Sequence, residues 1–326
     1  MIMKNLKSVI AAVIAAQAIA GAAAAQDVTL RLGHLANEQN IWNKAAEKFA
    51  EEVSALSEGR IAVEIYPNDT LGSEIDLING MQLGTADMTI TGESLQNWAP
   101  MAALLALPYA YTSLEQMDEV ASGPIGQEIE QQVIDKAGVR PLAYFARGPR
   151  QLSANRAITT PDELNGLKLR VPNVPLFLNV WQALGAQPTP MAFSEVFTSL
   201  QNGTIEAQEN PLSLVQSANF NEVQSTINMT NHVRSWIYLA ISELTWEGLS
   251  AEDQEAVTQA AKRAQEYERG LFLENEEAIR ADLEEKGVNF VEVDEAAFAE
   301  KARDAVVNGV SEELRPTVEQ IFAMQN

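Results

Sequence analysis

The segment Gly166-Leu-Lys-Leu-Arg170-Val-Pro-Asn173 says most about the fold, because it reads as a short buried strand that ends in a loop. Apolar residues alternate with Lys168 and Arg170, as in a strand with one buried face, and Pro172 ends the pattern. Arg170 therefore leaves the sheet near its carboxyl edge. A buried guanidinium pairs with a carboxylate through two parallel charge-assisted hydrogen bonds, which an ammonium group does not reproduce. Because the net charge of the chain is -23, this arginine favours the capture of a specific anion over a basic surface.

Two sets of strand and helix patterns surround this segment. The first set alternates as strand, helix, strand, helix and strand, and the second set begins near residue 139 and repeats the alternation. A capping box at residues 160–163 and Gly185 after a helical pattern mark helix boundaries in the second set. This order predicts an α/β fold with a mainly parallel sheet flanked by helices in each set. The predicted strands are 28–32, 61–65, 87–91, 139–145, 167–171 and 204–207, and the predicted helices are 42–56, 73–81, 176–184 and 194–200.

The first 25 residues have the pattern of a cleaved signal peptide. Lys4 and Lys7 precede an apolar run over residues 8–21, and the small residues at 22–25 suit a signal peptidase. A transmembrane anchor is the alternative, but the run is shorter than the roughly 20 residues that a bilayer requires. The lack of cysteine excludes disulfides, thiolate metal sites and a lipid anchor on an N-terminal cysteine. We therefore expect a free periplasmic protein, with no membrane insertion after cleavage.

The length of the chain favours two lobes, because about 300 residues remain after signal cleavage and one core rarely holds so many. Residues 232–242 read as a long strand that would cross between two sheets as part of a hinge. The helical pattern after Ser250 continues for about 35 residues, or about 50 Å, which exceeds one lobe, so we expect this helix to span both. The predicted lobes are 26–148 with about 236–275, and 149–235 with about 276–326.

The acidic composition excludes two classes of partner. The chain contains 45 Asp and Glu residues against 22 Lys and Arg residues, and such a surface repels nucleic acids and anionic membranes alike. Neither is a predicted partner. Most of these charges lie on predicted helix faces, which we interpret as a solubility or salt adaptation, and a monomer is expected.

The motifs of common enzymes are missing from the sequence. It contains two histidines and no Gly-x-Ser-x-Gly, His-Glu-x-x-His, phosphate-loop or Gly-x-Gly-x-x-Gly motif. A carboxylate pair for glycoside chemistry stays open, but no pair stands out among the many acids. We expect no catalytic residue, no metal and no cofactor. His232 is interpreted as a packed structural residue, and His34, at the end of the first strand, as a hydrogen-bonding wall of a ligand site.

Four motifs together resemble one protein family. They are Leu-Lys-Leu-Arg170-Val-Pro-Asn173, Pro188-Thr-Pro-Met-Ala-Phe193-Ser-Glu-Val, Gln208-Glu-Asn210-Pro211 and Met229-Thr-Asn-His232. In order and spacing they are similar to those of the solute-binding proteins of tripartite ATP-independent periplasmic (TRAP) transporters, of the DctP type, and the resemblance covers essentially the whole mature chain. It implies a two-lobed periplasmic-binding-protein fold with a long helix across both lobes. It also implies a non-catalytic protein that captures an organic acid in the interlobe cleft and delivers it to TRAP membrane permease subunits.

The resemblance also assigns roles to particular residues. By position, Arg170 is the arginine that forms a salt bridge with the carboxylate of the ligand, Arg150 is the upstream arginine of the site, and Asn210 is the asparagine of the cleft. Asn173 and Phe193 match positions that line the pocket. We expect lobe closure around the ligand to exclude water and to strengthen the ionic hydrogen bonds.

The loops of the first lobe indicate the kind of acid. The three predicted loops at strand ends contain Glu, Asn, Gln and His but no Lys or Arg, which suits hydroxyl groups better than a second carboxylate. We therefore favour a sugar acid, either a hexuronate or an aldonate, with Glu74 as a hydroxyl contact and Trp98 as a stacking wall. A C4-dicarboxylate stays open as an alternative ligand because of Arg147. This arginine would either bind a second carboxylate of the ligand or pair with a surface acid. Two further functions stay open, namely a binding protein of an ATP-driven importer and a secreted α/β enzyme.

Overall fold

The computed structural model describes residues 28–325, so the predicted signal peptide lies outside the described residues. None of the helices in this range has the length and apolar character of a membrane span. The strands are β1 (Val28–Gly33), β2 (Ile61–Tyr66), β3 (Met88–Thr91), β4 (Val139–Ala154), β5 (Lys168–Val171), β6 (Gln187–Pro190), β7 (Ala207–Pro211), β8 (Thr226–Ser242) and β9 (Asn289–Glu292). The helices are α2 (Ile41–Leu56), α3 (Glu74–Leu83), α4 (Leu114–Ser122), α5 (Pro124–Ala137), α6 (Pro175–Leu184), α7 (Val196–Gln201), α8 (Leu212–Ser217), α9 (Glu243–Gly248), α10 (Ala251–Glu285), α11 (Glu295–Asn308) and α12 (Arg315–Ala323).

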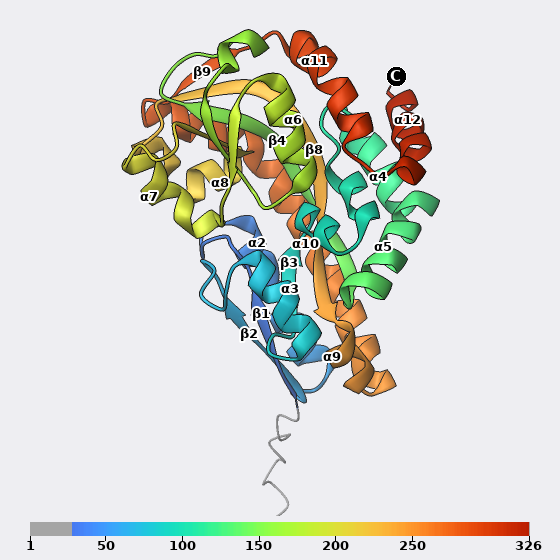
Figure 1. Ribbon diagram of the computed structural model, residues 1–326. Helices are drawn as coiled ribbons and strands as arrows, with labels where there is room; N and C mark the ends of the chain where they lie inside the picture. Colours follow the sequence, from blue (N-terminus) through green and yellow to red (C-terminus); the bar gives the residue numbers. More distant parts are fainter. Residues whose placement is uncertain (1–27, 326) are drawn as a thin grey trace, which may run out of the picture.

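The predicted alternation of the first lobe is confirmed. Strand β1 pairs in parallel with β2 and with β3, and helices α2 and α3 connect them. Helix α2 begins at the cap Asn40, whose side chain accepts a hydrogen bond from the amide of Trp42, and it buries the apolar stripe that includes Phe49 and Val53. These elements form the lower part of the molecule in Figure 1.

The second lobe repeats this arrangement in the upper part of Figure 1. Strand β5 pairs in parallel with β6 and β7. Helix α6 ends at Gly185, which has a φ of 112° that other residues rarely adopt, as its sequence position predicted. The predicted capping box at Thr160 opens only a short 3₁₀ turn, Pro161–Leu164. Strand β6 was not predicted, because Pro188 and Pro190 are unusual in strands. Prolines are tolerated in β6 because it is an edge strand of the sheet.

Two long antiparallel strands join the lobes into one sheet. Strand β8 starts six residues earlier than predicted, and β4 runs unbroken where the sequence suggested a new unit. The sheet order is β2-β1-β3-β8-β4-β7-β5-β6, with β9 paired to β8. The pairing of β4 with β8 shifts its register between Arg147 and Arg150, at the predicted junction near residue 148. We propose that the boundary between the two lobes lies at this irregularity, and we keep the lobe bounds that the sequence predicted.

Helix α10 spans both lobes over 35 residues, as predicted (Figure 1). It packs against α2 and β4 at one end and against α8 at the other. The carboxylate of Glu276 on this helix lies close to Gly148 of β4, because a Cβ atom at position 148 would lie 2.4 Å from Oε1 of Glu276. A larger residue at position 148 would therefore require the end of the Glu276 side chain to move.

Glu268 of α10 is fully buried against β4. Its Oε2 accepts a hydrogen bond from the amide of Ala146 at 3.3 Å, and burial raises its pKa from 4.5 to about 8. Between pH 4.5 and 8, Glu268 stays protonated in the folded protein but ionises in the unfolded chain. The free energy of unfolding therefore falls as the pH rises through this range. We expect Glu268→Gln to stabilise the protein at pH 8 and to have little effect at pH 4.5, measured by urea unfolding. The exposed Glu266→Gln is the control, and an equal gain at both pH values would contradict the assignment.

Candidate functional site

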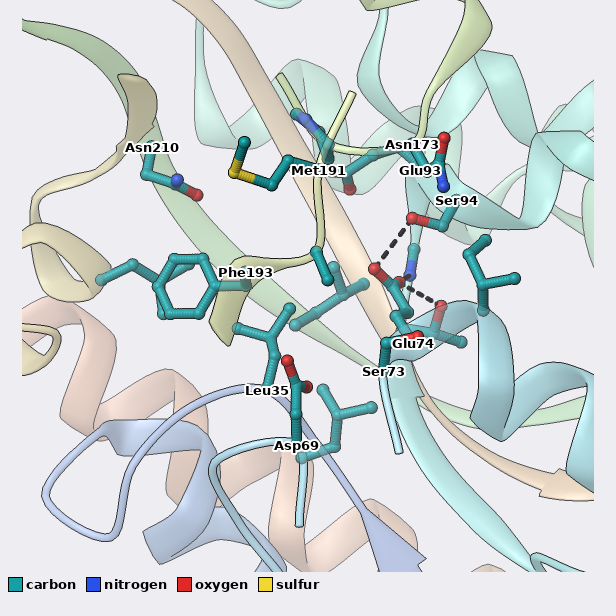
Figure 2. Close-up of a pocket in the computed structure, with 18 of the residues that line it drawn as sticks. Leu35, Asp69, Ser73, Glu74, Glu93, Ser94, Asn173, Met191, Phe193 and Asn210 are labelled. Atoms are coloured by element: carbon teal, nitrogen blue, oxygen red, sulfur yellow. Dashed lines mark hydrogen bonds between the residues drawn. The ribbon is translucent and has the colours of Figure 1, made fainter. Parts of the chain in front are cut away.

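A cavity of about 290 Å³ lies at the carboxyl ends of the parallel strands, between the two lobes (Figure 2). Residues that follow β1, β2 and β3 line it from the first lobe, and residues of and after β5, β6 and β7 line it from the second. The lining residues are Leu35, Trp42, Asp69, Ser73, Glu74, Ile75, Asp76, Ile90, Thr91, Gly92, Glu93, Ser94, Arg147, Arg150, Arg170, Pro172, Asn173, Met191, Ala192, Phe193, Asn210, Leu214 and Ile237. Open parallel sheets bind ligands at this edge.

Arg170 enters the cavity from β5 and has no carboxylate partner among residues 28–325. Its side chain is buried, with 3% of the residue exposed. Its Nε and Nη2 donate to the carbonyl oxygen of Met191 at 3.0 and 2.6 Å, and its guanidinium carbon lies 5.9 Å from the ring centre of Phe193. It forms no salt bridge within the described range. Burial without an anionic partner lowers its pKa to about 10. An anionic ligand would stabilise the charged form of this guanidinium group.

Arg150, in contrast, is fully engaged by two buried acids. Its Nε and Nη2 donate to the two carboxylate oxygens of Glu209 on β7 at 2.5 and 2.7 Å, and its Nη1 donates to Glu93 at 3.2 Å. Burial alone would raise the pKa of Glu209, but Arg150 and His232 lower it to about 2. Arg150 thus borders the cavity as one member of a neutralised ion pair.

His232 is the structural residue that the sequence suggested. Its Nε2 lies 2.8 Å from Oε2 of Glu209, its Nδ1 lies 2.8 Å from Oγ1 of Thr230, and its ring packs edge-on against Trp181. Both ring nitrogens are therefore engaged by the protein, and the residue does not line the cavity.

Arg147 pairs with a buried acid rather than with one at the surface. Its Nη1 donates to both oxygens of Glu93, at 2.8 and 2.6 Å, and its guanidinium lies over the ring of Trp42. Burial opposes the charge of Glu93, but Arg147 and Arg150 hold the pKa of Glu93 below its usual value. Glu93 consequently bridges two arginines at the wall of the cavity.

Glu74, the first residue of α3, projects into the cavity with its carboxylate fixed by three donors. Thr91 Oγ1 at 2.5 Å and the amide of Gly92 at 3.4 Å donate to Oε1, and Ser94 Oγ donates to Oε2 at 2.8 Å, as the dashed lines in Figure 2 show for the side-chain donors. Burial and then the nearby Glu93 raise the pKa of Glu74. A carboxylate held in this way still has lone pairs for ligand hydroxyl groups.

Three further predicted residues line the second-lobe side of the cavity: Asn173, Phe193 and Asn210 (Figure 2). Asn210 Nδ2 donates to Oε1 of Gln208 at 2.7 Å, which orients its amide. The carbonyl oxygen of Asn173 accepts a hydrogen bond from Asn97 of the first lobe at 2.8 Å. The positions of these residues agree with ligand-binding roles, which stay predictions.

His34 and Trp98 are not among the residues that line the cavity, so their predicted places in its wall need correction. His34 is 1% exposed, and its Nε2 lies 3.2 Å from Oδ1 of Asn43 on α2. Its side chain turns into the first-lobe core, where burial lowers its pKa to about 4. Trp98 packs against the largest apolar core instead. Strand-end position alone does not decide whether a side chain faces the cleft or the core.

The sequence analysis did not single out four acidic residues at or behind the cavity wall, namely Glu93, Glu209, Asp69 and Asp76. Glu93 and Asp69 belong to the first-lobe loops that lack cations, and Glu209 lies within the Gln208–Pro211 motif. Two buried arginines in an acidic protein were a signal for buried carboxylate partners. The sequence did not indicate which of the 45 acids they would be.

The comparison with family models decides the relationship. The model described as bacterial extracellular solute-binding protein, family 7 (DctP), matches residues 32–312. The chain belongs to this family. This DctP protein is accordingly a TRAP periplasmic solute-binding protein, a transport protein rather than an enzyme, and its compartment is the periplasm, as the sequence predicted.

Individual relatives agree with this assignment. A solute-binding protein of Roseobacter denitrificans is 68% identical over 315 residues, which are 96% of this chain and 97% of that protein. The crystal structure of a TRAP periplasmic solute-binding protein from the same organism with bound L-galactonate has a TM-score of 0.90 at 70% identity, covering 91% of this chain and 99% of that one. A protein from Xanthobacter autotrophicus with bound β-D-galacturonate has a TM-score of 0.86 at 28% identity, covering 91% and 100%.

Proposed function

We propose that this DctP protein binds a six-carbon sugar acid, preferentially an aldonate of the galactonate type, and delivers it to the membrane subunits of a TRAP permease. The observation that carries the proposal is Arg170, a buried guanidinium that lines the cavity and has no carboxylate partner in the described chain. A ligand carboxylate would supply that partner, and charge-assisted hydrogen bonds of this kind are short and strong in a buried site.

The charges around the cavity favour one carboxylate on the ligand. Arg147 and Arg150 are already paired with Glu93 and Glu209, which leaves Arg170 as the unpaired cation of the lining within residues 28–325. A dicarboxylate would bring a second anion toward a wall that carries Glu74 and Asp69. Uncompensated like charges in a buried site are costly, so the arrangement disfavours a C4-dicarboxylate.

The polar groups away from Arg170 suit a chain of hydroxyl groups. Glu74, Asn210 and Ser94 line the cavity with acceptors and donors, and they are held by hydrogen bonds to neighbouring residues. Apolar lining by Leu35, Met191 and other residues covers the carbon chain. Precise polar groups in a mostly apolar pocket are typical of small-ligand sites.

The relatives support a sugar acid over other carboxylates. The relative at 70% identity carries L-galactonate, and a protein of Advenella mimigardefordensis at 29% identity was crystallised with galactonate. Succinate is bound in a relative at 27% identity. The ligands of these relatives therefore share a carboxylate group but not a carbon skeleton.

Delivery to the permease follows from the family and from the two-lobe architecture. Hydrogen bonds between the lobes, such as that from Asn97 to Asn173, stabilise the closed form, and a ligand that contacts both lobes adds to them. Membrane subunits that favour the open form would then release the ligand. We propose a monomer as the carrier.

A ligand panel tests the proposal. We expect L-galactonate to raise the melting temperature of the purified protein in proportion to the logarithm of its excess over the dissociation constant. Galacturonate should give a smaller shift, and succinate and neutral L-galactose should give none. A shift from succinate that equals the shift from L-galactonate would contradict the single-carboxylate argument, and no shift from any sugar acid would contradict the proposed ligand class.

A further inference from the structure

Asp69 has a buried carboxylate oxygen that forms no hydrogen bond within residues 28–325. This residue lines the cavity on the first-lobe side, and Figure 2 shows its carboxylate directed from its loop toward the interior. Its Oδ2 accepts a hydrogen bond from the amide of Ser194 in the second lobe at 3.3 Å. Its Oδ1 is buried and has no hydrogen-bond partner among the described residues. Buried polar atoms in native proteins are nearly always paired, so an orphan beside a ligand cavity points to a ligand group.

The loop of Asp69 is built to hold this side chain in place. Asn68 and Asp69 both adopt left-handed backbone angles, with φ of 57° and 55°, which Asn and Asp tolerate better than most residues. The amide of Asp69 donates to the carbonyl oxygen of His34 at 3.1 Å, and the amide of Asn68 donates to that of Ala36 at 3.0 Å. The loop after β2 is therefore fixed to the loop after β1, and the direction of the carboxylate is fixed with it.

A role in closure alone does not account for both oxygens. One acceptor suffices for the Ser194 amide, and a serine or asparagine side chain would provide it without burying a free carboxylate oxygen. Arg170 does not compensate the charge directly, because no salt bridge joins these two described residues. Burial, moreover, raises the pKa of Asp69, and the nearby Ser194 and Arg170 offset this effect only in part.

We infer that Asp69 is a specificity-determining residue whose Oδ1 accepts a hydrogen bond from a hydroxyl group of the bound sugar acid while its Oδ2 holds the second lobe through Ser194. The inference rests on the proposed function and deepens it. Recognition of one hydroxyl group and closure of the lobes then depend on the same carboxylate. Acids that lack this hydroxyl leave Oδ1 unpaired when the site closes, and they are rejected for that reason.

The variant Asp69→Asn tests this assignment with a change of one atom. Asparagine is compatible with the left-handed backbone, keeps an oxygen for the Ser194 amide and replaces the free acceptor with an NH₂ donor. Binding is measured by calorimetry for L-galactonate and for a set of analogues that each lack one hydroxyl group. We expect at least a ten-fold loss of affinity for L-galactonate and for every analogue except one. That analogue, which lacks the contacted hydroxyl, should bind wild type and variant alike.

Asn97→Ala is the matched control for closure. Asn97 also bridges the lobes, through its hydrogen bond to the carbonyl oxygen of Asn173, but it does not line the cavity. Its removal should weaken all ligands by a similar factor. An Asp69→Asn variant that loses the same factor for every ligand, or loses none, overturns the assignment while the proposed function stands. If the wild-type protein binds no sugar acid, the proposed function fails and the assignment of Asp69 fails with it. Equal melting temperatures of the ligand-free proteins exclude misfolding as the cause.

Discussion

Replacing Arg170 with alanine is expected to weaken ligand binding by at least about 30-fold and to leave the fold intact. Loss of one partner from a buried ionic pair costs about 2 to 5 kcal/mol of binding free energy, or roughly a 30-fold to several thousand-fold loss of affinity. The ligand-free protein should keep its stability, because Arg170 is buried without a carboxylate partner in the described chain and its removal relieves a desolvated charge. Calorimetry with L-galactonate measures the affinity, and thermal unfolding without ligand measures the stability.

Two further variants sharpen the Arg170 experiment. Arg170→Lys keeps the positive charge but loses the planar pair of donors, so it should bind with an affinity between those of the wild type and the alanine variant. Arg156→Ala removes an exposed arginine, whose Nη2 donates to the carbonyl oxygen of Glu163, and it should bind as the wild type does. Unchanged affinity of the Arg170→Ala variant for L-galactonate would contradict the proposed role of Arg170 in ligand binding.

Replacing Glu209 with glutamine is expected to cause the largest loss of stability. Glu209 is fully buried and compensates Arg150 through two hydrogen bonds to its carboxylate oxygens. Breaking a buried pair by removing one charge costs about 3 to 5 kcal/mol, since the remaining charge stays buried without compensation. Urea unfolding measures this difference. The exposed Glu285→Gln is the control and should change the unfolding free energy by less than about 0.5 kcal/mol.

The effect of Glu209→Gln should also depend on pH. The carboxylate has a pKa of about 2 in the folded protein and 4.5 as its ordinary value. Its contribution to stability is therefore present above pH 4.5 and is lost as the pH falls toward 2. The stability difference between wild type and variant should shrink across that interval. A difference that stays constant from pH 6 to pH 3 would mean that Glu209 acts through packing rather than through charge.

Most of the predicted local elements could be derived from the sequence alone, and so could the choice of Arg170 as the arginine that we propose binds the ligand. Strand and helix periods, caps such as Gly185 and the length of the helix after Ser250 depend on neighbouring residues along the chain. These features could therefore be predicted from the sequence, as could the placement of Arg170 at a strand end. The family motifs also indicated Asn173, Phe193 and Asn210, which line the cavity.

The pairing of the buried charges, and the choice of side chains that face the cavity, depend on contacts between residues that are distant in the sequence. Arg150 meets Glu209 across paired strands and Arg147 meets Glu93 across 54 residues of sequence, and periodicity carries no information about such contacts. The same limit explains why His34 was expected in the cavity wall and turns instead into the core. Pairing of buried charges depends on distance in space and on desolvation, so only the folded chain shows that Arg147 and Arg150 are compensated and that Arg170 has no carboxylate partner among residues 28–325.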